Sequence, residues 1–565
     1  MWTLQPMQPM SALLAFLLFL CVFAVHAQTG GAVVPDGGSL LQQIRPVKPP
    51  APAPTGTGLR IEKEGGTAPS PGTPFNVNTI RISGNTLFDS PTLHALVADA
   101  EGKTLTLAQL LELAARITDY YRDQGYPLSR AIIRAQVIRD GLVDVEVIEA
   151  RYGKIVLDNS SRVNDPLLQA TLSSLAHGQV IRQADLDHAL LLLSDVPGVM
   201  VGATLKPGET VGTSDLLVNA TPGPAIAANV EMDNYGNRYT GRARIGGTVN
   251  FINPLRHGDV LTVSGLSSGS GLSYARLAYD SLLNGAGTRL GGSYSSLDYR
   301  LGGSLAPLEA HGTAQVASLW ARHPLARSRD TNLYGQIQFD RLQLRDHIDV
   351  NAIRTDRHLA TGTASLTGDA RDALIAGAVT TWTIGGTTGR VDFDDAAAQS
   401  ADALTAGTRG GFSRFNASVV RMQALSPKNM LYFLIAGQWA DRNLDSSQKM
   451  IAGGPYSVRA FDIGAISGDT GYLATAEFRR DLGSAANGRW QGIAFVDSAH
   501  ITVNKKAWVA GINSATLSGA GVGLNWAGAN GWSVITYAAV RIGANPQLVA
   551  PGASARAWAG IKKTF

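Results

Sequence analysis

The sequence predicts a membrane β-barrel of about 16 antiparallel strands, preceded by two small α/β modules. High glycine content (63 of 565 residues) with only 16% charged residues is typical of a large β-protein. From residue 225 onward, short segments alternate between apolar side chains and Arg, Gln, Glu or Asn, the pattern of lipid outside and water inside. Before them, residues 75–150 and 151–221 repeat one order of elements, β-α-α-β-β.

Residues 1–27 are expected to be a signal peptide. Ser11 to Val25 form an apolar run of the length of a signal-peptide core, and Val25-His26-Ala27 fits a small-residue cleavage site. The only cysteine, Cys21, lies inside this segment. The mature chain is therefore expected to have no disulfide and no cysteine metal site.

Residues 28–74 form a linker rich in Pro, Gly, Ala and Thr, with one short helix predicted over 39–45. Ser39 is expected to be the N-cap, Gln42 completes a capping box, and Pro46 ends the helix. A helix this short is marginal alone in water. It is therefore expected either to fray or to dock on a partner surface.

Each α/β module is predicted to hold two helices packed on a small sheet. In the first, Pro91 begins one helix, which extends to about Asp99, and Thr106 caps the other. Segments 131–138 and 142–148 alternate as a hairpin. Such a module leaves a sheet edge beside a helix, where another chain can add a strand.

Residues 225–565 are predicted to be the transmembrane barrel. In Arg242–Phe251, for example, Ile245, Val249 and Phe251 alternate with polar side chains. The alternative is an array of soluble β-sandwiches. The barrel is favoured because the polar face carries too many Arg, Gln, Glu and Asn residues for a buried soluble core.

An interruption at 440–471 between two predicted strands is expected to fold into the barrel. Two glycines and a proline in Gly453–Phe461 force a turn, and Arg459 follows among small and aromatic residues, where it needs an acceptor. Alternation in Trp490–Ile501 points Phe495 and Asp497 into the lumen. A charge-assisted Arg459–Asp497 pair is one interpretation; separate solvation of both groups in a polar lumen is the other.

The mature chain resembles the TpsB transporters of bacterial two-partner secretion, relatives of the Bam and Sam barrel-assembly proteins. The resemblance covers the signal peptide, the helix with its linker, both modules and the barrel, and includes the stretches Asp233–Gly241 and Arg327–Tyr334. Its most specific part is Val458-Arg459-Ala460-Phe461, similar to the family's VRG(F/Y) loop motif, together with Phe495-Val496-Asp497, similar to its FxD strand motif.

This resemblance implies that Arg459 contacts Asp497 inside the pore. It also implies that the modules at 75–150 and 151–221 are POTRA-like and capture an unfolded exoprotein in the periplasm. The short helix would plug the resting pore; its residues are Ser39, Leu40, Leu41, Gln42 and Arg45. Ala460 and Ala499 stand where the family usually has glycine.

No enzymatic activity, cofactor or metal site is expected. The sequence has no Walker-type GxxxxGK[ST] or HExxH motif, and the GxSxG match at Gly265–Gly269 ends an alternating strand instead of forming a strand-to-helix elbow. No basic run exceeds two lysines, so nucleic acid is not an expected partner.

The expected location is the outer membrane, with the modules in the periplasm. By the same resemblance, the expected partners are a large secreted exoprotein, outer-membrane lipid and the barrel-assembly machinery that inserts the chain. The exoprotein would be an adhesin, a haemolysin or an iron-acquisition protein. Two other functions stay open at this point: a barrel-assembly or insertion factor of the same superfamily, and a plain outer-membrane channel. The small number of modules and the plug-like helix disfavour the first, and a plain channel leaves the modules and the Arg459 loop without a role.

Overall fold

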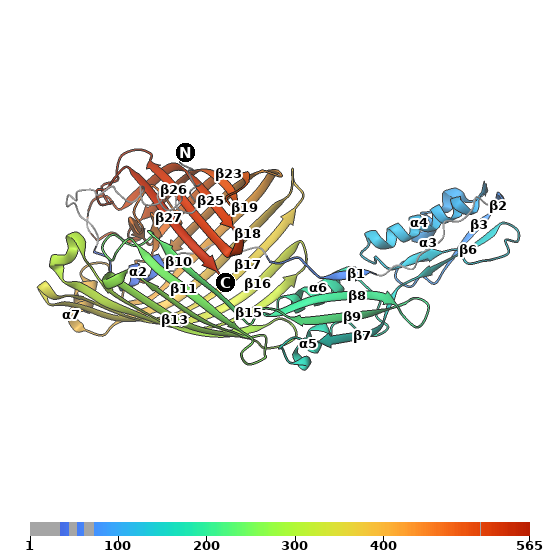
Figure 1. The fold of residues 1–565 in the computed structure, drawn as a ribbon, viewed down its shortest axis with the longest axis horizontal. Coiled ribbons are helices and arrows are strands. Elements are labelled where there is room, and N and C mark those ends of the chain that lie inside the picture. The colour runs from blue at the N-terminus through green and yellow to red at the C-terminus, as the bar shows by residue number, and fades with distance from the viewer. Residues whose placement is uncertain (1–33, 45–52, 62–72, 509) are drawn as a thin grey trace, which may run out of the picture.

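A computed structural model describes residues 34–44, 53–61, 73–508 and 510–565. The predicted signal peptide, residues 1–27, lies outside these ranges. A barrel forms one end of the molecule, and the two α/β modules extend from it in line (Figure 1). Among the described residues, no helix is both long and apolar enough to cross a bilayer.

The C-terminal part is a closed antiparallel barrel of sixteen strands, which confirms the predicted fold class. Each strand pairs with its neighbours in chain order, β20 pairs with β23, and β10 closes the barrel against β27. The strands are β10 (Ile226–Asp233), β11 (Arg244–Ile252), β12 (Val260–Ser267), β13 (Leu272–Leu282), β14 (Arg289–Arg300), β15 (Ala310–Arg327), β16 (Thr331–Ile348), β17 (Ile353–Asp372), β18 (Ala378–Phe393), β19 (Gly410–Ser426), β20 (Asn429–Ala440), β23 (Thr470–Ala485), β24 (Gly488–Thr502), β25 (Ser514–Gly528), β26 (Trp532–Arg541) and β27 (Ala555–Thr564).

The barrel wall is apolar outside and polar inside because the strand period is two residues. On β16, Ile337 and Phe339 are 53% and 63% exposed on the outer face. Between them, Gln338 points inward and donates from Nε2 to Oδ1 of Asp340 at 2.9 Å. In this part of β16 the inner face carries hydrogen-bonded polar side chains, while the outer face offers apolar side chains to lipid.

The first module contains a sheet in the order β3-β6-β5 and a second sheet of two strands. Thr106 and Gln109 form the predicted capping box of α4, whose Leu110, Ile117 and Tyr121 are buried. Its elements are β2 (Phe75–Val77), β3 (Thr79–Ser83), α3 (Ser90–His94), η1 (Ala98–Ala100), β4 (Lys103–Leu105), α4 (Leu107–Asp123), β5 (Arg130–Ile132) and β6 (Leu142–Ile148).

Two local predictions for this module are wrong. The helix led by Pro91 ends at His94 instead of Asp99. The strand expected over 131–138 is only Arg130–Ile132, because the Gln136 side chain takes the place of a backbone partner. Its amide accepts from Asp144 N and donates to Asp144 O, both at 2.8 Å.

The second module has the predicted β-α-α-β-β order, and the linker adds a strand to it. Its elements are β7 (Arg151–Asn159), α5 (Asp165–Leu172), α6 (Gln183–Ser194), β8 (Val199–Pro207) and β9 (Thr213–Pro222). The linker strand β1 (Leu59–Ile61) pairs in parallel with the edge strand β8. This part of the linker is therefore docked as a strand on the second module, a contact that the sequence analysis did not predict.

The linker and the second module meet the barrel at the turn between β15 and β16. The buried guanidinium of Arg327 donates from Nε to Asp195 Oδ2 (2.7 Å) at the end of α6, and from Nη2 to Pro54 O (2.7 Å). One residue earlier in the linker, Ala53 O accepts from Arg371 Nη2 at 2.6 Å. These contacts fix the second module and residues 53–54 to the periplasmic mouth of the barrel.

Inside the barrel lies the short helix α2 (Gly37–Ile44) (Figure 1). The segment between β20 and β23 also packs against the inner wall, where its Val458, Ala460 and Phe461 join a buried cluster with β24 and β25. That segment is called the infolded loop below. It contains η5 (Ser446–Gln448) and a small hairpin of β21 (Met450–Ala452) and β22 (Ile466–Gly468). The remaining helices lie in turns and loops of the barrel: η2 (Gly269–Gly271), η3 (Gly303–Leu308), η4 (Asp349–Asn351), α7 (Ala396–Ala403) and η6 (Ala529–Gly531).

Candidate functional site

The tip of the infolded loop is a compact turn that carries Arg459 to the barrel wall. Gly453 and Gly454 have φ angles of 101° and 102°, which side chains other than glycine rarely adopt. Gly454 N donates to Phe461 O at 3.1 Å and closes the turn. The glycine pair therefore sets the conformation that presents the residues between them and Phe461.

Arg459 and Asp497 form a bidentate ion pair inside the barrel. Nε and Nη2 of Arg459 donate to Oδ2 and Oδ1 of Asp497 at 2.8 and 2.7 Å, and the backbone N of Arg459 donates to Oδ2 at 3.1 Å. The side chains are 4% and 0% exposed. Three hydrogen bonds to one carboxylate fix both the position and the orientation of the loop tip.

Two more charged residues of β23 complete this cluster. Arg459 Nη1 donates to Glu477 Oε1 at 2.7 Å, and Arg479 Nε donates to the other oxygen of Glu477 at 2.7 Å. We call Arg459, Arg479, Glu477 and Asp497 the loop cluster. It contains two cations and two anions, so its formal charge is zero. Glu477 was not identified from the sequence, although the two-residue period of the strand places it on the same face as Arg479.

Aromatic rings of the wall enclose the guanidinium. The Arg459 guanidinium carbon lies 3.4 Å from the Phe495 ring centroid and 4.9 Å from that of Tyr537, a cation–π arrangement. Trp558 Nε1 on β27 donates to Arg459 O at 2.7 Å. The sequence analysis placed Phe495 in the lumen, whereas Tyr537 and Trp558 were not identified.

The neighbours of Arg459 in the motif are packed against the wall. Val458, Ala460 and Phe461 are 0%, 1% and 4% exposed. A Cβ atom added at Gly519 would lie 2.5 Å from the Cβ of Ala460, closer than two carbon atoms can approach. Glycine at position 519 of the wall therefore makes room for alanine at position 460, where the resemblance leads one to expect glycine.

The short helix α2 begins earlier than predicted. Its N-cap is Asp36 instead of Ser39, because Asp36 Oδ1 accepts from Ser39 N at 2.9 Å and Ser39 Oγ accepts from Asp36 N at 3.0 Å. Gln42, which was expected to close the capping box, instead donates to Ser447 O in the infolded loop. Arg45 lies outside the described residues.

The helix is seated in the lumen by apolar and polar contacts. Leu40 and Leu41 are 1% and 6% exposed and belong to a cluster of buried residues from β13 to β20, which includes Leu344 and Leu359 of the wall. Asn237 Nδ2 donates to Gln43 Oε1 at 3.0 Å. The helix is thus docked, which is one of the two outcomes that its length allowed.

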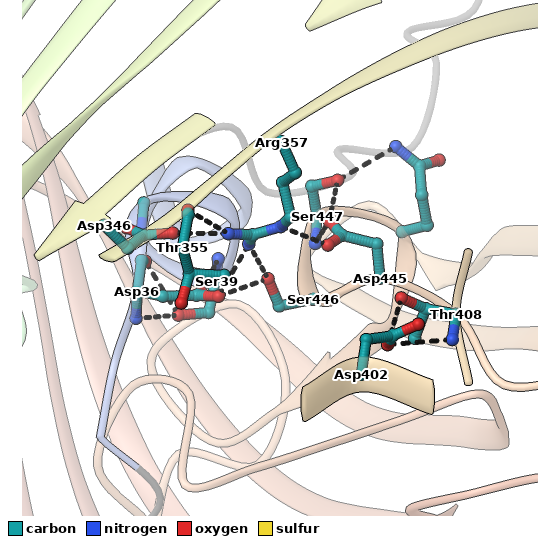
Figure 2. A network of polar contacts seen from close by, with 12 residues as sticks. Asp36, Ser39, Asp346, Thr355, Arg357, Asp402, Thr408, Asp445, Ser446 and Ser447 are labelled. Carbon is teal, nitrogen blue, oxygen red and sulfur yellow. Dashed lines mark hydrogen bonds and ion pairs between the residues drawn. The ribbon is translucent and has the colours of Figure 1, made fainter. Parts of the chain in front are cut away.

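Arg357 of β17 joins the helix, the infolded loop and the wall (Figure 2). Its guanidinium donates to Asp36 Oδ2 (2.8 Å), to Asp346 Oδ2 on β16 (2.6 Å) and to Asp445 Oδ2 in the loop. Only 4% of the Arg357 side chain is exposed. We call these four residues the plug cluster; the sequence analysis did not identify it.

The plug cluster has one cation and three carboxylates. Neutral donors supplement Arg357: Ser446 Oγ donates to Asp36 Oδ2 at 2.6 Å, and Tyr299 Oη donates to Asp346 Oδ1 at 2.7 Å. Burial alone would raise the pKa of Asp36, but Arg357 and hydrogen bonds from Ser446 and Ser39 outweigh it, and the pKa is lowered from its usual 3.8.

The chemistry of both clusters is that of ion pairing. Within the part of the chain that the structure describes, no group of three or more His, Cys, Asp or Glu side chains could hold a metal ion. The arrangement can hold two segments inside the barrel through charged and polar contacts, and it can release them when these contacts break.

Family models match two parts of the chain. The model described as "Haemolysin secretion/activation protein ShlB/FhaC/HecB" matches residues 212–526. The model described as "POTRA domain, ShlB-type" matches residues 75–150.

Individual relatives were found by sequence and by structure. The chain is 29% identical over 384 residues to the heme/hemopexin transporter protein HuxB of Haemophilus influenzae, covering 67% of each protein. It is 27% identical over 278 residues to the outer membrane transporter CdiB of Escherichia coli, covering 47% of this chain and 46% of CdiB. The solved structure of CdiB from Escherichia coli superposes with a TM-score of 0.69 at 22% identity, covering 89% of this chain and 93% of that chain.

Proposed function

This chain belongs to the ShlB/FhaC/HecB family of haemolysin secretion/activation proteins. We propose that it exports one secreted partner protein through its barrel. Its periplasmic modules capture one unfolded secreted protein, and the barrel passes that protein through the outer membrane without nucleotide hydrolysis. The Arg459–Asp497 pair holds the infolded loop in the resting pore, and α2 is the plug that leaves during export.

Family membership confirms the resemblance to two-partner secretion transporters. Members of this family are outer-membrane β-barrel transporters that secrete partner proteins; they carry POTRA domains in the periplasm and are not enzymes. Which protein this chain exports belongs to the proposal. The proposed partner is a large secreted adhesin, haemolysin or iron-acquisition protein.

The observation that carries the proposal is the way the lumen is filled. α2 and the infolded loop both lie inside the barrel, and an ion pair attaches each of them to the wall: Asp36 to Arg357, and Arg459 to Asp497. Charged and hydrogen-bonded contacts can be exchanged for water at small net free-energy change, whereas a purely apolar core cannot. Contacts of this kind are suited to break and to form again, and we assign the segment that leaves to α2, while the Arg459–Asp497 pair holds the infolded loop.

Capture by strand addition is supported by the sheets of the two modules. An edge strand offers backbone hydrogen bonds that do not depend on the sequence of the added chain, which suits an unfolded substrate. In the first module, β5 lies at the edge of the β3-β6-β5 sheet. In the second, β1 of the linker already covers the β8 edge, so a substrate strand added there must displace the linker.

Export without nucleotide hydrolysis is supported by the sequence, which has no Walker-type phosphate-binding motif. Folding of the partner outside the cell would then make passage through the pore irreversible. Insertion of the chain by the barrel-assembly machinery is part of the same proposal.

The proposal is tested by comparing secreted and surface proteins of three strains: wild type, a deletion strain and a strain with Arg459→Ala. We expect one large protein to disappear from the surface and medium of the deletion strain. Arg459→Ala is expected to insert normally and to lower export at least about tenfold, because a buried bidentate ion pair is lost. Mass spectrometry of both fractions gives the readout.

Arg442→Ala is the matched control, because Arg442 lies in the same loop and its guanidinium donates to two backbone oxygens outside the loop cluster, Gly411 O (2.9 Å) and Gly407 O (2.7 Å). Normal export in the Arg459→Ala strain would contradict the proposed role of Arg459. A general loss of other outer-membrane barrels in the deletion strain would favour an assembly factor instead. Unchanged secretion in that strain would refute the exporter.

A further inference from the structure

The seam between the first and last barrel strands has a short backbone ladder. β10 and β27 pair over five residues, Asn229–Asp233 with Gly560–Thr564. β10 pairs with β11 over eight residues, and β26 pairs with β27 over nine. The first half of β27, from Ala555 to Ala559, therefore extends beyond the ladder toward the extracellular side.

Side chains bridge the seam where the ladder ends. The backbone N of Asn234 donates to Ala559 O at 3.2 Å, and its side-chain amide accepts from Ala559 N at 2.9 Å and donates to Ala557 O at 3.1 Å, which extends the contact between the two strands beyond the five paired residues. The rings of Tyr235 and Trp558 then meet edge to face at a centroid distance of 5.9 Å. These contacts join the two strands directly.

Farther out, the infolded loop connects the two sides. Asp462, directly after the Val458–Phe461 motif, accepts from Arg556 Nη2 on β27 at 2.6 Å. The same carboxylate lies 3.1 Å from Arg242 Nη1 and 3.8 Å from Arg238 Nη1, both in the segment between β10 and β11. Asp462 and Arg556 are partly buried, with side chains 17% and 12% exposed.

We propose that Asp462 is a positioning residue that closes the extracellular end of the β10–β27 seam. Three guanidinium groups from the two sides converge on one carboxylate, and without it they face one another as like charges. The carboxylate belongs to the infolded loop and to neither strand. Withdrawal of the loop from the lumen therefore removes the bridge and loosens the seam at the same time.

This inference goes beyond the proposed export function and does not depend on it, since the seam is a property of the protein without its partner. It is tested on the purified full chain in detergent by hydrogen exchange with mass spectrometry. Asp462→Asn is expected to speed exchange in 555–559 at least about tenfold, because these amides then open locally more often. Exchange at 493–499, beside Arg459, is expected to stay within twofold of wild type.

Glu309→Gln is the matched control, because Glu309 is an exposed acid in the extracellular loop between β14 and β15. The double variant Asp462→Asn/Arg556→Gln is expected to exchange more slowly in 555–559 than Asp462→Asn alone. Removing Arg556 relieves the repulsion that the first change creates, a coupling that a general loss of structure does not produce.

Unchanged protection of 555–559 in Asp462→Asn would overturn the proposal. Equal acceleration in 493–499 would also overturn it, because Asp462 would then hold only the loop. If Asp462→Asn does not fold, Arg556→Gln tests the proposal in its place. This variant removes the cation on the β27 side, so it must also speed exchange in 555–559, and unchanged exchange there would overturn the proposal. Heat-dependent migration on a semi-native gel verifies that each variant retains a folded barrel.

Discussion

The loop cluster around Arg459 and the plug cluster around Arg357 differ in charge balance. In the loop cluster, Arg459 and Arg479 meet Glu477 and Asp497 in equal numbers. In the plug cluster, one guanidinium serves three carboxylates, one each from the helix cap, the wall and the infolded loop. The first cation is carried by the movable segment, whereas the second is carried by the wall.

Because of this difference, we expect the contacts of the loop cluster to persist and those of the plug cluster to open. A balanced buried pair loses stability only when one partner is removed. An acid-rich cluster is stabilised by its single cation and by neutral donors. Small changes in its charge therefore shift the equilibrium between the docked and the released plug. The plug is therefore expected to leave more readily than the infolded loop, and four experiments test this order.

The largest effect is expected for Arg357→Gln. The variant leaves three carboxylates together without a cation, which weakens plug docking by about 3–5 kcal/mol. Conductance in planar bilayers should rise because the helix leaves the lumen. Arg354→Gln, an exposed arginine on the same strand, is the matched control. Equal conductance of the two variants would show that Arg357 does not hold the plug.

Asp497→Asn is expected to have the next largest effect. Arg459 keeps Glu477 as a partner, so loop docking should weaken by about 3 kcal/mol, the lower end for a broken buried pair. Hydrogen exchange of residues 453–461 measures the loss, and export should fall with it. Asp441→Asn, at the exposed start of the loop, is the control. If both variants protect 453–461 equally, the ion pair is not what holds the loop tip.

A smaller effect is expected for Asp36→Asn. Asparagine is also a good N-cap, so the variant removes the charge and keeps the helix start. The plug cluster loses one ion pair but also one of its excess negative charges, and docking should weaken by only about 1 kcal/mol. Conductance should lie between that of wild type and that of Arg357→Gln. A rise as large as that of Arg357→Gln would argue against an excess of negative charge in the cluster.

Acidification should give the smallest effect. Because the pKa of Asp36 is lowered in the docked state, its contribution is present above the usual value of 3.8 and is lost as the pH falls below 3.8 through the lowered pKa. The component of conductance that depends on Asp36 should therefore rise in this acidic range. Asp36→Asn should lack this component of the profile, and identical profiles for the two proteins would assign the response to other groups.

Strand periodicity was sufficient to predict which side chains face the lumen, whereas the contact between Arg459 and Asp497 was implied by the family resemblance. Alternation in the segment that becomes β24 placed Phe495 and Asp497 in the lumen, and the glycine pair with Arg459 indicated a loop that needed an acceptor. Glu477 follows from the same periodicity. These features are local, because a two-residue period and a turn can be read from neighbouring residues.

The plug cluster could not be predicted because its members meet only through the tertiary fold. Asp36 and Arg357 are separated by 321 positions, and their contact depends on the seat of α2 in the lumen. Two cap pairs of equal spacing, Asp36 with Ser39 and Ser39 with Gln42, competed for the helix start. The hydrogen bond from Gln42 to Ser447 O in the infolded loop takes Gln42 away from the helix start, and no local rule contains that information.

The anchoring of Ala53 and Pro54 at the barrel mouth limits how far α2 can move from that mouth. From Ile44 to Ala53 the chain has about nine residues, which reach at most about 30 Å when fully extended. While Arg371 and Arg327 grip the carbonyl oxygens of Ala53 and Pro54, the helix can swing no farther than this from the periplasmic rim. A larger displacement of α2 requires the hydrogen bonds from these two arginines to break first. Because Arg327 also binds Asp195 of the second module, such a displacement is coupled to that module.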